Sequence, residues 1–421
     1  MLRYLKSRTF ACLAALAAGA MFAIPATAQD KKPIRIGFGM AETGPLGPNG
    51  KSALLSMEIW AEETNAKGGL LGRPVQLVHY DDQTNPSAVP GIYTKLLDID
   101  KVDIIVGGYG TNMLAPAMPV VMQRKKLFLG LYGLGVNTDF KYDRYFAMIP
   151  SGPEPKTSFT KGFFDTTMAQ NPKPTTVAIV AADAEFSKNA SDGARENAQK
   201  AGLKIVYDKS YPPTTTDFSP IVRAIQATNP DLVVICSYPL DSVGMVLAAN
   251  EAKLNPKMIG GAMVGLQSTV FKTKLGPALN GYMNYDFWLP AKSLMFKGTA
   301  EFLAKYQERA AKAGVDPLGY YMALFSYAYL DVLGQAITAT KSLDDGKLAD
   351  YIRKTTFKTV VGDVSFGKGG EWAKSRVFQA QFRGIKGNGV DQFKDPNTLA
   401  IITPAEYKSG DVIYPYEKAK Q

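Results

Sequence analysis

Two glycine-containing patterns near the start of the chain could bind a nucleotide, but each lacks residues that such binding requires. Gly50-Lys51-Ser52 matches the last three positions of a phosphate-binding loop. That motif also needs glycine at position 45, where the chain has Pro45. Pro45 and Pro48 also lack the backbone N–H groups with which such a loop holds phosphate. Gly37-Phe38-Gly39 begins a dinucleotide-binding pattern, but Glu42 stands at its third glycine. We therefore expect no nucleotide cofactor.

The residue types that serve catalysis or metal binding are equally sparse. His79 is the only histidine of the 421 residues, and it lies within the strand-like segment VQLVHY. A metal site or a Ser-His-Asp triad around it would have no second histidine and no cysteine pair to draw on. Asp81-Asp82 resembles a carboxylate pair, but adjacent strand residues point to opposite faces, so we expect loop and cap residues. The sequence predicts no catalytic residue, no metal site and no enzyme.

The segment from residue 34 to residue 86 predicts a strand, a loop, a helix and a second strand. Apolar residues alternate over Ile34–Phe38, and the Gly, Pro and Asn residues of 44–50 indicate a loop. Apolar spacings of three and four predict a helix over 51–66, with Asn49 as its N-cap. The loop therefore lies at the carboxyl end of a strand, where open α/β sheets bind ligands.

Two further strands should bring their loops to the same edge. The segment 102–106 leads into Gly107–Gly110, and the segment 127–131 leads into Tyr132–Gly135. Thr111 or Asn112 is expected to cap a helix that reaches residue 122. Unpaired N–H groups at a helix start attract carboxylates, so this edge is a candidate site for an organic acid.

A second alternating set of helices and strands follows residues 150–155, where three prolines suit a crossing between domains. It runs over 156–259 and predicts a second parallel sheet. Its loops carry Asp183–Phe186, Ser237–Pro239 and Gly260–Met263. Residues 282–290 are expected to form the return crossing. Helices at 299–313, 319–340 and 345–354 would then pack on the first lobe.

The first 28 residues have the features of a secretory signal. Basic residues precede an apolar run over 10–24, and Ala26-Thr27-Ala28 offers a cleavage site after Ala28. Cleavage leaves 393 residues, enough for two domains, and lowers the formal charge from +10 to +7 because three basic residues are lost. The basic residues are dispersed, so we expect a solvated surface and no nucleic-acid partner. The sequence indicates a soluble periplasmic protein.

Cysteine usage excludes an intramolecular disulfide after such cleavage. Of the two cysteines, only Cys236 remains, inside the apolar run DLVVICS. We expect it to be a small buried hydrophobic residue and not a reactive thiol.

Three phrases resemble one known family. They are TGPLGPNG at 43–50, EETNAKGGLLGRPVQLVHYDD at 62–82 and DFSPIVRAIQATNPDLVV at 217–234. In these phrases the chain is similar to the periplasmic solute-binding proteins of branched-chain amino acid (leucine/isoleucine/valine-type) ABC transporters. The resemblance implies a type I periplasmic-binding-protein fold, in which two doubly wound parallel-sheet lobes are joined by a three-segment hinge. The implied boundaries are 29–150 plus 286–362 for lobe 1 and 151–285 plus 363–421 for lobe 2.

The resemblance also implies the residues around a ligand between the lobes. Thr111 and the backbone near Leu134 would hold a carboxylate, while three aromatic side chains would cover its apolar body. Relatives often carry a disulfide near this cleft, and the matching positions here, Thr84 and Gly110, are not cysteine. The full predicted set is Asn49, Tyr109, Thr111, Tyr132, Gly133, Leu134, Phe186, Tyr238, Ala262 and Tyr321.

One position departs from the family pattern. Ala262 aligns where amino-acid-binding relatives place an acid to pair with the ligand's ammonium group. Burying an ammonium without a counter-charge costs several kcal/mol. The departure favours an amine-free aromatic or branched aliphatic acid, or an amide. A branched-chain amino acid stays open, because Asp183 or Glu185 could supply the missing charge.

The predicted function is capture of a small organic carboxylate by hinge closure, as the substrate-binding protein of an ABC importer. The expected partners are the small-molecule ligand and the importer's membrane permease, and the expected state is a monomer. A periplasmic ligand-sensing subunit of a signalling or chemotaxis receptor is the alternative, since it would use the same fold.

Overall fold

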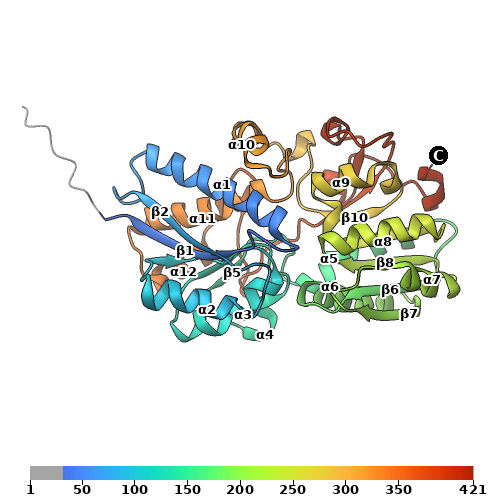
Figure 1. Cartoon of the computed structure of the whole chain (residues 1–421), viewed down its shortest axis with the longest axis horizontal. Helices are drawn as coiled ribbons and strands as arrows, with labels where there is room; N and C mark the ends of the chain where they lie inside the picture. Colours follow the sequence, from blue (N-terminus) through green and yellow to red (C-terminus); the bar gives the residue numbers. More distant parts are fainter. Residues whose placement is uncertain (1–31, 421) are drawn as a thin grey trace, which may run out of the picture. The chain divides into compact units, whose positions relative to one another are not determined.

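The computed structural model of the chain describes residues 32–420 (Figure 1). The predicted signal segment and its cleavage site lie outside these residues. Within residues 33–420, the blue and orange elements lie together on the left of Figure 1, and the green, yellow and red elements lie on the right. We call these two groups the first lobe and the second lobe.

The first lobe is built on short parallel strands. Strands β1 (Ile34–Met40), β2 (Val75–Asp81) and β3 (Ile104–Ile105) pair in the order β2-β1-β3. Strands β4 (Phe128–Gly130) and β5 (Tyr145–Ala147) form a parallel pair beside them. The amides of Gly107 and Gly110 donate to the carbonyls of Leu129 and Leu131, so the chain after β3 continues the pairing to β4. The predicted parallel arrangement is confirmed.

Helices cover these strands. Those that follow the strands directly are α1 (Gly47–Ala66), α2 (Val89–Thr94), which continues as a π-helical turn (Lys95–Ile99), α3 (Thr111–Gln123) and α4 (Val136–Phe140). Three more come from the later part of the chain: α10 (Thr299–Ala313), α11 (Ala323–Thr340) and α12 (Asp345–Lys354). Arg309 on α10 pairs with Glu62 on α1 at 2.7 Å, and the Tyr329 hydroxyl on α11 lies 3.3 Å from the Met57 sulfur. Helices α10 and α11 therefore pack beside α1.

Helix α1 begins four residues earlier than expected, at Gly47. Proline is tolerated in the first turn because its missing N–H would have no intrahelical partner there, so Pro48 does not delay the helix. The prediction that Asn49 is the N-cap is wrong, because Leu46 occupies that position and Asn49 is already helical. The helix lies close to β1: a Cβ atom on Gly50 would stand 1.8 Å from the Ala41 carbonyl oxygen.

The second lobe is built on one seven-stranded sheet with the order β14-β13-β10-β9-β8-β6-β7. Its strands are β6 (Thr176–Ala182), β7 (Lys204–Tyr211), β8 (Leu232–Ser237), β9 (Met258–Met263), β10 (Met283–Asp286), β13 (Phe378–Phe382) and β14 (Leu399–Thr403). Strands β6, β7, β8, β9 and β10 pair in parallel. Strand β13 pairs antiparallel with β10 on one side and with β14 on the other. Residues 282–290 are predicted to be the return crossing between the lobes. In the structure, this segment also contains β10, which belongs to the sheet of the second lobe.

The second lobe's helices connect its strands in sequence. They are α5 (Pro155–Met168), α6 (Glu185–Lys200), α7 (Ser219–Ala227), α8 (Pro239–Glu251) and α9 (Thr269–Leu275). Short 3-10 turns occur at Val264–Leu266, Gly276–Leu279, Lys292–Leu294, Asp391–Lys394, Ala405–Tyr407 and Tyr416–Lys420. A small antiparallel hairpin, β11 (Phe357–Thr359) and β12 (Gly362–Val364), precedes the return to β13. The residue boundaries predicted for the two lobes stay a prediction.

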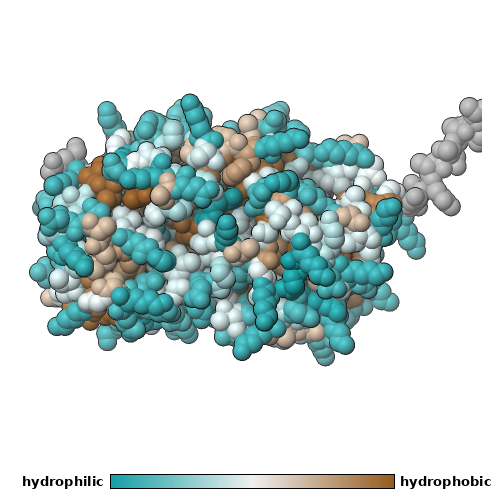
Figure 2. Space-filling view, turned by 180° about the vertical axis from the view of Figure 1, so that it is seen from behind, coloured by the Kyte–Doolittle hydropathy of each residue, from teal (hydrophilic) through white to brown (hydrophobic). Residues whose placement is uncertain are grey.

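Hydrophilic residues predominate on the face shown in Figure 2, and hydrophobic residues appear among them in patches. None of the helices within residues 32–420 is long and apolar enough to cross a membrane. The same residues contain no group of three or more His, Cys, Asp or Glu side chains that could hold a metal ion.

Cys236 lies on β8 and is fully buried, as predicted. Burial raises the pKa of its thiol to about 12, so almost no thiolate forms at neutral pH. We expect the folded protein to resist a thiol-specific reagent at pH 8 for hours, and to react within minutes in denaturant. Rapid reaction of the folded protein would contradict the buried position.

Candidate functional site

The loops at the carboxyl ends of strands from both lobes enclose a small cavity, which we call the inner cavity. Its volume is about 20 Å³, roughly what one water molecule needs. Six of the residues that line the inner cavity are aromatic, and none is charged. The full lining consists of Leu46, Tyr109, Gly110, Thr111, Tyr132, Ile149, Phe186, Tyr238, Val264, Tyr285 and Tyr321. The inner cavity has no room for an organic acid or an amino acid in this arrangement of the chain.

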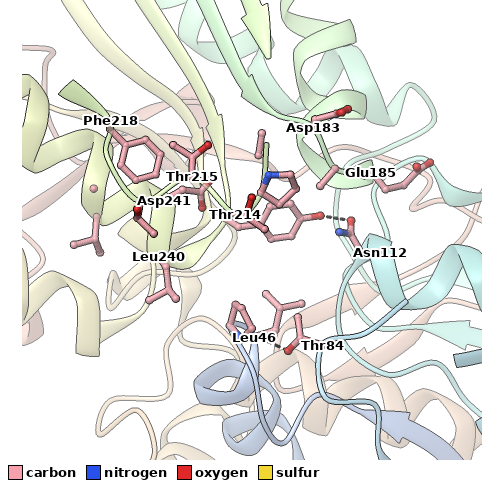
Figure 3. A pocket seen from close by; sticks show the side chains of 18 of the residues that line it. Leu46, Thr84, Asn112, Asp183, Glu185, Thr214, Thr215, Phe218, Leu240 and Asp241 are labelled. Carbon is pink, nitrogen blue, oxygen red and sulfur yellow. Dashed lines mark hydrogen bonds between the residues drawn. The ribbon is translucent and has the colours of Figure 1, made fainter. Parts of the chain in front are cut away.

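A second and much larger space, the outer cavity, adjoins the inner one (Figure 3). Its volume is about 1100 Å³, and Leu46 and Tyr238 line both cavities. The first lobe contributes residues of the loops after β1 and β2 and the start of α3, while the second lobe contributes the loops after β6 and β7 and one face of α8. Leu46 and Thr84 lie below the opening in Figure 3, opposite Asp183 and Glu185.

Tyr238 forms the wall between the two cavities. Its hydroxyl group donates to Asn112 Oδ1 of the first lobe and accepts a hydrogen bond from the Phe186 amide at 3.1 Å. The Phe186 amide also lies 3.2 Å from Asn112 Oδ1, and the two aromatic rings meet edge to face with centroids 5.7 Å apart. These contacts join the lobes directly at the candidate site.

Tyrosine hydroxyl groups dominate the polar lining of the inner cavity. Asn49 Nδ2 donates to the Tyr109 hydroxyl at 2.9 Å, and that hydroxyl lies 3.5 Å from the Tyr321 hydroxyl. Tyr132 donates to the Tyr321 carbonyl at 2.8 Å, and its backbone is left-handed, with φ of 58°. Burial raises the pKa of Tyr109 to about 12 and the pKa values of Tyr132 and Tyr321 well above their usual range. These hydroxyl groups are therefore neutral donors at physiological pH.

Helix α3 starts at the inner cavity, but neither predicted residue caps it. Gly110 occupies the N-cap position with φ of 97°, a conformation that favours glycine, and Thr111 is already helical. Thr111 Oγ1 accepts a hydrogen bond from the Leu134 amide at 3.0 Å. The Leu134 amide is thus already paired within the protein, while the Thr111 hydroxyl proton can still be donated to a ligand.

Six of the ten predicted site residues line the inner cavity: Tyr109, Thr111, Tyr132, Phe186, Tyr238 and Tyr321. Asn49 does not line the inner cavity but donates a hydrogen bond to Tyr109, which does. Gly133, Leu134 and Ala262 line neither cavity. A Cβ atom on Gly133 would stand 2.6 Å from the Tyr145 hydroxyl, so its small size serves close packing.

The loop expected at Gly260–Met263 is instead strand, because β9 extends to Met263. Gly260 and Gly261 have φ values of 142° and 108° but keep the pairing with β8. Ala262 pairs with Cys236 inside the sheet and is fully buried. Val264, two residues later, is the residue of this segment that reaches the inner cavity, and it is also uncharged.

Five lining residues are absent from the predicted set: Leu46, Gly110, Ile149, Val264 and Tyr285. Tyr285 could have been found from the alternation in YMNYDF at 282–287, which is typical of a strand and places Tyr285 and Phe287 on one face. In the structure these two rings lie 5.3 Å apart.

His79 and the adjacent aspartates have structural contacts. The His79 ring stacks on Phe38 with centroids 5.4 Å apart, and its Nδ1 lies 2.9 Å from Glu42 Oε1. Asp81 ends β2 and accepts hydrogen bonds from the amides of the β1–α1 loop. Burial raises the pKa of Asp82 to about 6, although the Thr84 amide acts against this. Neither aspartate caps a helix, since Ala88 precedes α2.

A buried carboxylate, Asp316, also joins the lobes. It lies between α10 and α11, and its Oδ2 accepts hydrogen bonds from the Ser268 hydroxyl at 3.1 Å and the Thr269 amide at 2.5 Å, at the start of α9. Its Oδ1 accepts from the amides of Leu318 and Gly319. Sequence reasoning gave no sign of this residue.

Comparisons with known proteins agree with this architecture. A family profile described as periplasmic binding protein matches residues 33–387. The chain is 27% identical over 341 residues to Leu/Ile/Val-binding protein homolog 7 of Brucella abortus, covering 79% of this chain and 82% of that protein. It is 24% identical over 354 residues to homolog 8 of the same species, covering 81% and 86%.

Two solved structures show the same fold. One is the branched-chain amino acid transporter substrate-binding protein LivJ of Streptococcus pneumoniae in complex with isoleucine. It has a TM-score of 0.71 at 18% identity and covers 91% of this chain and 100% of that chain. The other is a solute-binding protein of an ABC transporter from R. palustris in complex with 4-hydroxybenzoate. It has a TM-score of 0.72 at 18% identity and covers 91% and 98%.

The profile match extends over most of the chain, and both lobes with their parallel strands are present. The predicted fold and the prediction of a binding protein, not an enzyme, are therefore confirmed. This chain belongs to the periplasmic binding protein family.

Proposed function

We propose that this chain is the substrate-binding component of an ABC importer and captures a small organic carboxylate between its lobes. The observation that carries the proposal is the inner cavity, where Thr111 and the start of α3 meet a lining of six aromatic residues without any charged side chain. Helix starts favour anions, and apolar rings favour an apolar body. The proposed ligand is an aromatic or branched aliphatic acid, and a branched-chain amino acid is its alternative.

The ligands of similar proteins support this range. The Streptococcus pneumoniae protein holds isoleucine, and the R. palustris protein holds 4-hydroxybenzoate. Val264 supplies no counter-charge for an ammonium group, which favours the amine-free acids within the inner cavity. We propose that the six predicted residues of the inner cavity surround the ligand, with Asn49 behind Tyr109. To these we add Leu46, Gly110, Ile149, Val264 and Tyr285.

We propose that the lobes close around the ligand at a hinge, and the small inner cavity between them supports this. A ligand that contacts both lobes favours the closed arrangement, and we propose that the closed surface is what the membrane permease binds. We further propose a monomer in the periplasm, after cleavage near Ala28. No cofactor is proposed.

Thr111→Val is expected to weaken binding of benzoate about ten-fold or more, because it removes a hydrogen bond to a charged group. Thr111→Ser keeps the hydroxyl group and should stay within about three-fold of the parent, given that ten-fold corresponds to 1.4 kcal/mol. Titration calorimetry of the ligand-stripped protein against benzoate and 4-hydroxybenzoate, followed by isoleucine, measures both variants. Equal affinities of the two variants would remove Thr111 from the ligand site, and no binding of any of these acids by the parent would refute the proposal.

A further inference from the structure

The two adjoining cavities differ in electrical character. No charged residue lines the inner cavity, whereas Asp183, Glu185 and Asp241 line the outer one with a single basic residue, Lys274. The carboxylates therefore outnumber the cations at the outer cavity, and a positively charged group is favoured there over a negative one.

The three carboxylates are not equally engaged. Asp183 pairs with Lys188 at 3.5 Å, and Asp241 accepts a hydrogen bond from the Tyr211 hydroxyl. Burial raises the pKa of Asp241 to about 6, so this group is mostly ionised at pH 7. The exposed Glu185 carboxylate has no hydrogen bond or ion pair to any residue within 32–420. Glu185 is thus the acid most available to a ligand.

The rest of the outer cavity is largely apolar. Phe218, Val243 and Pro213 contribute to its wall, and Leu240 and Leu247 on α8 are 55% and 46% exposed. A ligand that covers these side chains gains a free energy of about 25 cal/mol for each Å² of apolar surface removed from water. The volume of about 1100 Å³ is far more than a single amino acid needs. The outer cavity thus suits the apolar body of a longer ligand.

We propose that the ligand spans both cavities, with its carboxylate in the inner cavity, an apolar body beside Tyr238, and an amine in the outer cavity facing Glu185 and Asp241. The ligand class is an acid whose amine is separated from the carboxylate by an apolar spacer, such as an ω-amino acid or an aminomethyl aromatic acid. This inference rests on the proposed function for the carboxylate end. A spanning ligand takes the place of the hydrogen bond between Tyr238 and Asn112, which separates the two cavities.

Matched pairs of ligands test the amine. Calorimetry compares hexanoate with 6-aminohexanoate, and benzoate with 4-(aminomethyl)benzoate, on the ligand-stripped protein. We expect the amine-bearing member of at least one pair to bind about ten-fold tighter, and leucine, whose amine adjoins its carboxylate, to gain no such advantage.

Glu185→Gln should reduce that advantage about five-fold while leaving the amine-free acids unchanged, and Asp241→Asn should act in the same direction. Glu196→Gln is the matched control. It lies on the same helix, pairs with Lys200 and lines neither cavity, so it should change nothing.

The outcomes separate the two proposals. Amine-free acids that bind as tightly as their amine-bearing partners would overturn the spanning ligand and leave the proposed function intact. If Glu185→Gln weakens the binding of both members of a pair equally, the spanning ligand is likewise overturned and the proposed function is left intact. If no acid of either kind binds, both proposals fail.

Discussion

Asp316→Ala is expected to lower the free energy of unfolding by about 3 kcal/mol or more, because it removes the acceptor for four buried donors. The Asp316 side chain is 8% exposed and bonds the Ser268 hydroxyl and the amides of Thr269, Leu318 and Gly319. No alanine atom can accept these bonds, and the surrounding packing excludes most water. Urea denaturation of the ligand-stripped protein at pH 7 measures the loss.

Asp316→Asn separates the loss of acceptors from the loss of charge. Its amide oxygen can still serve one pair of donors, so we expect about half the destabilisation. Asp391→Ala is the control, because Asp391 is 90% exposed and bonds only to Lys394, three residues along. A loss below about 1 kcal/mol for Asp316→Ala would mean that water replaces the carboxylate.

Glu371→Gln is expected to stabilise the protein increasingly as the pH rises. Burial raises the pKa of Glu371 from its usual value near 4.5 to about 8, with only the Ser151 hydroxyl, at 3.5 Å, acting against this. Between these two pH values the folded state holds a proton that the unfolded state has lost. The free energy of unfolding therefore falls with rising pH, by up to about 1.4 kcal/mol per pH unit.

The neutral glutamine removes this dependence. At pH 5 the variant and the parent should differ little, and by pH 8 the variant should be more stable by about 2 to 4 kcal/mol. Denaturant titrations at pH 5, 6, 7 and 8 give the comparison. Glu308→Gln on α10, an exposed position, should leave the pH dependence unchanged. A constant difference between Glu371→Gln and the parent across the range would mean that Glu371 is ionised in the folded protein at pH 5.

The alternation of strands and helices could be predicted from sequence because several strands are short apolar runs closely followed by glycine or proline, as β3 is by Gly107 and β8 by Pro239. The cap assignments at Asn49 and Thr111 failed because the residue at a cap position depends on the backbone conformation there. At α3 the cap position has a φ of 97°, which Gly110 adopts more easily than Thr111 or Asn112. Leu46 precedes α1 without any side-chain cap, which no propensity scale would favour.

The site could be predicted in part because its residues follow strand ends. Tyr109, Thr111, Tyr132 and Tyr238 all stand within a few residues of a strand's last residue. Ala262 was assigned to a loop because two glycines precede it, yet those glycines continue the strand pairing. Asp316 acts through contacts with Ser268 and Thr269, which are distant in sequence, and local patterns do not predict such contacts.

The seven-stranded sheet draws its strands from two distant stretches of chain, and this sets the order in which the second lobe can be completed. Strand β13 pairs with β10 across about ninety intervening residues, which include the first-lobe helices α10, α11 and α12. Until residues 378–403 are available for pairing, β10 is an edge strand of the sheet, and such an edge in an incomplete chain can pair wrongly. A chain of this topology therefore completes its second lobe only after its last strands are made. A chain that ends before β13 lacks both β13 and β14, so the sheet of its second lobe ends at β10.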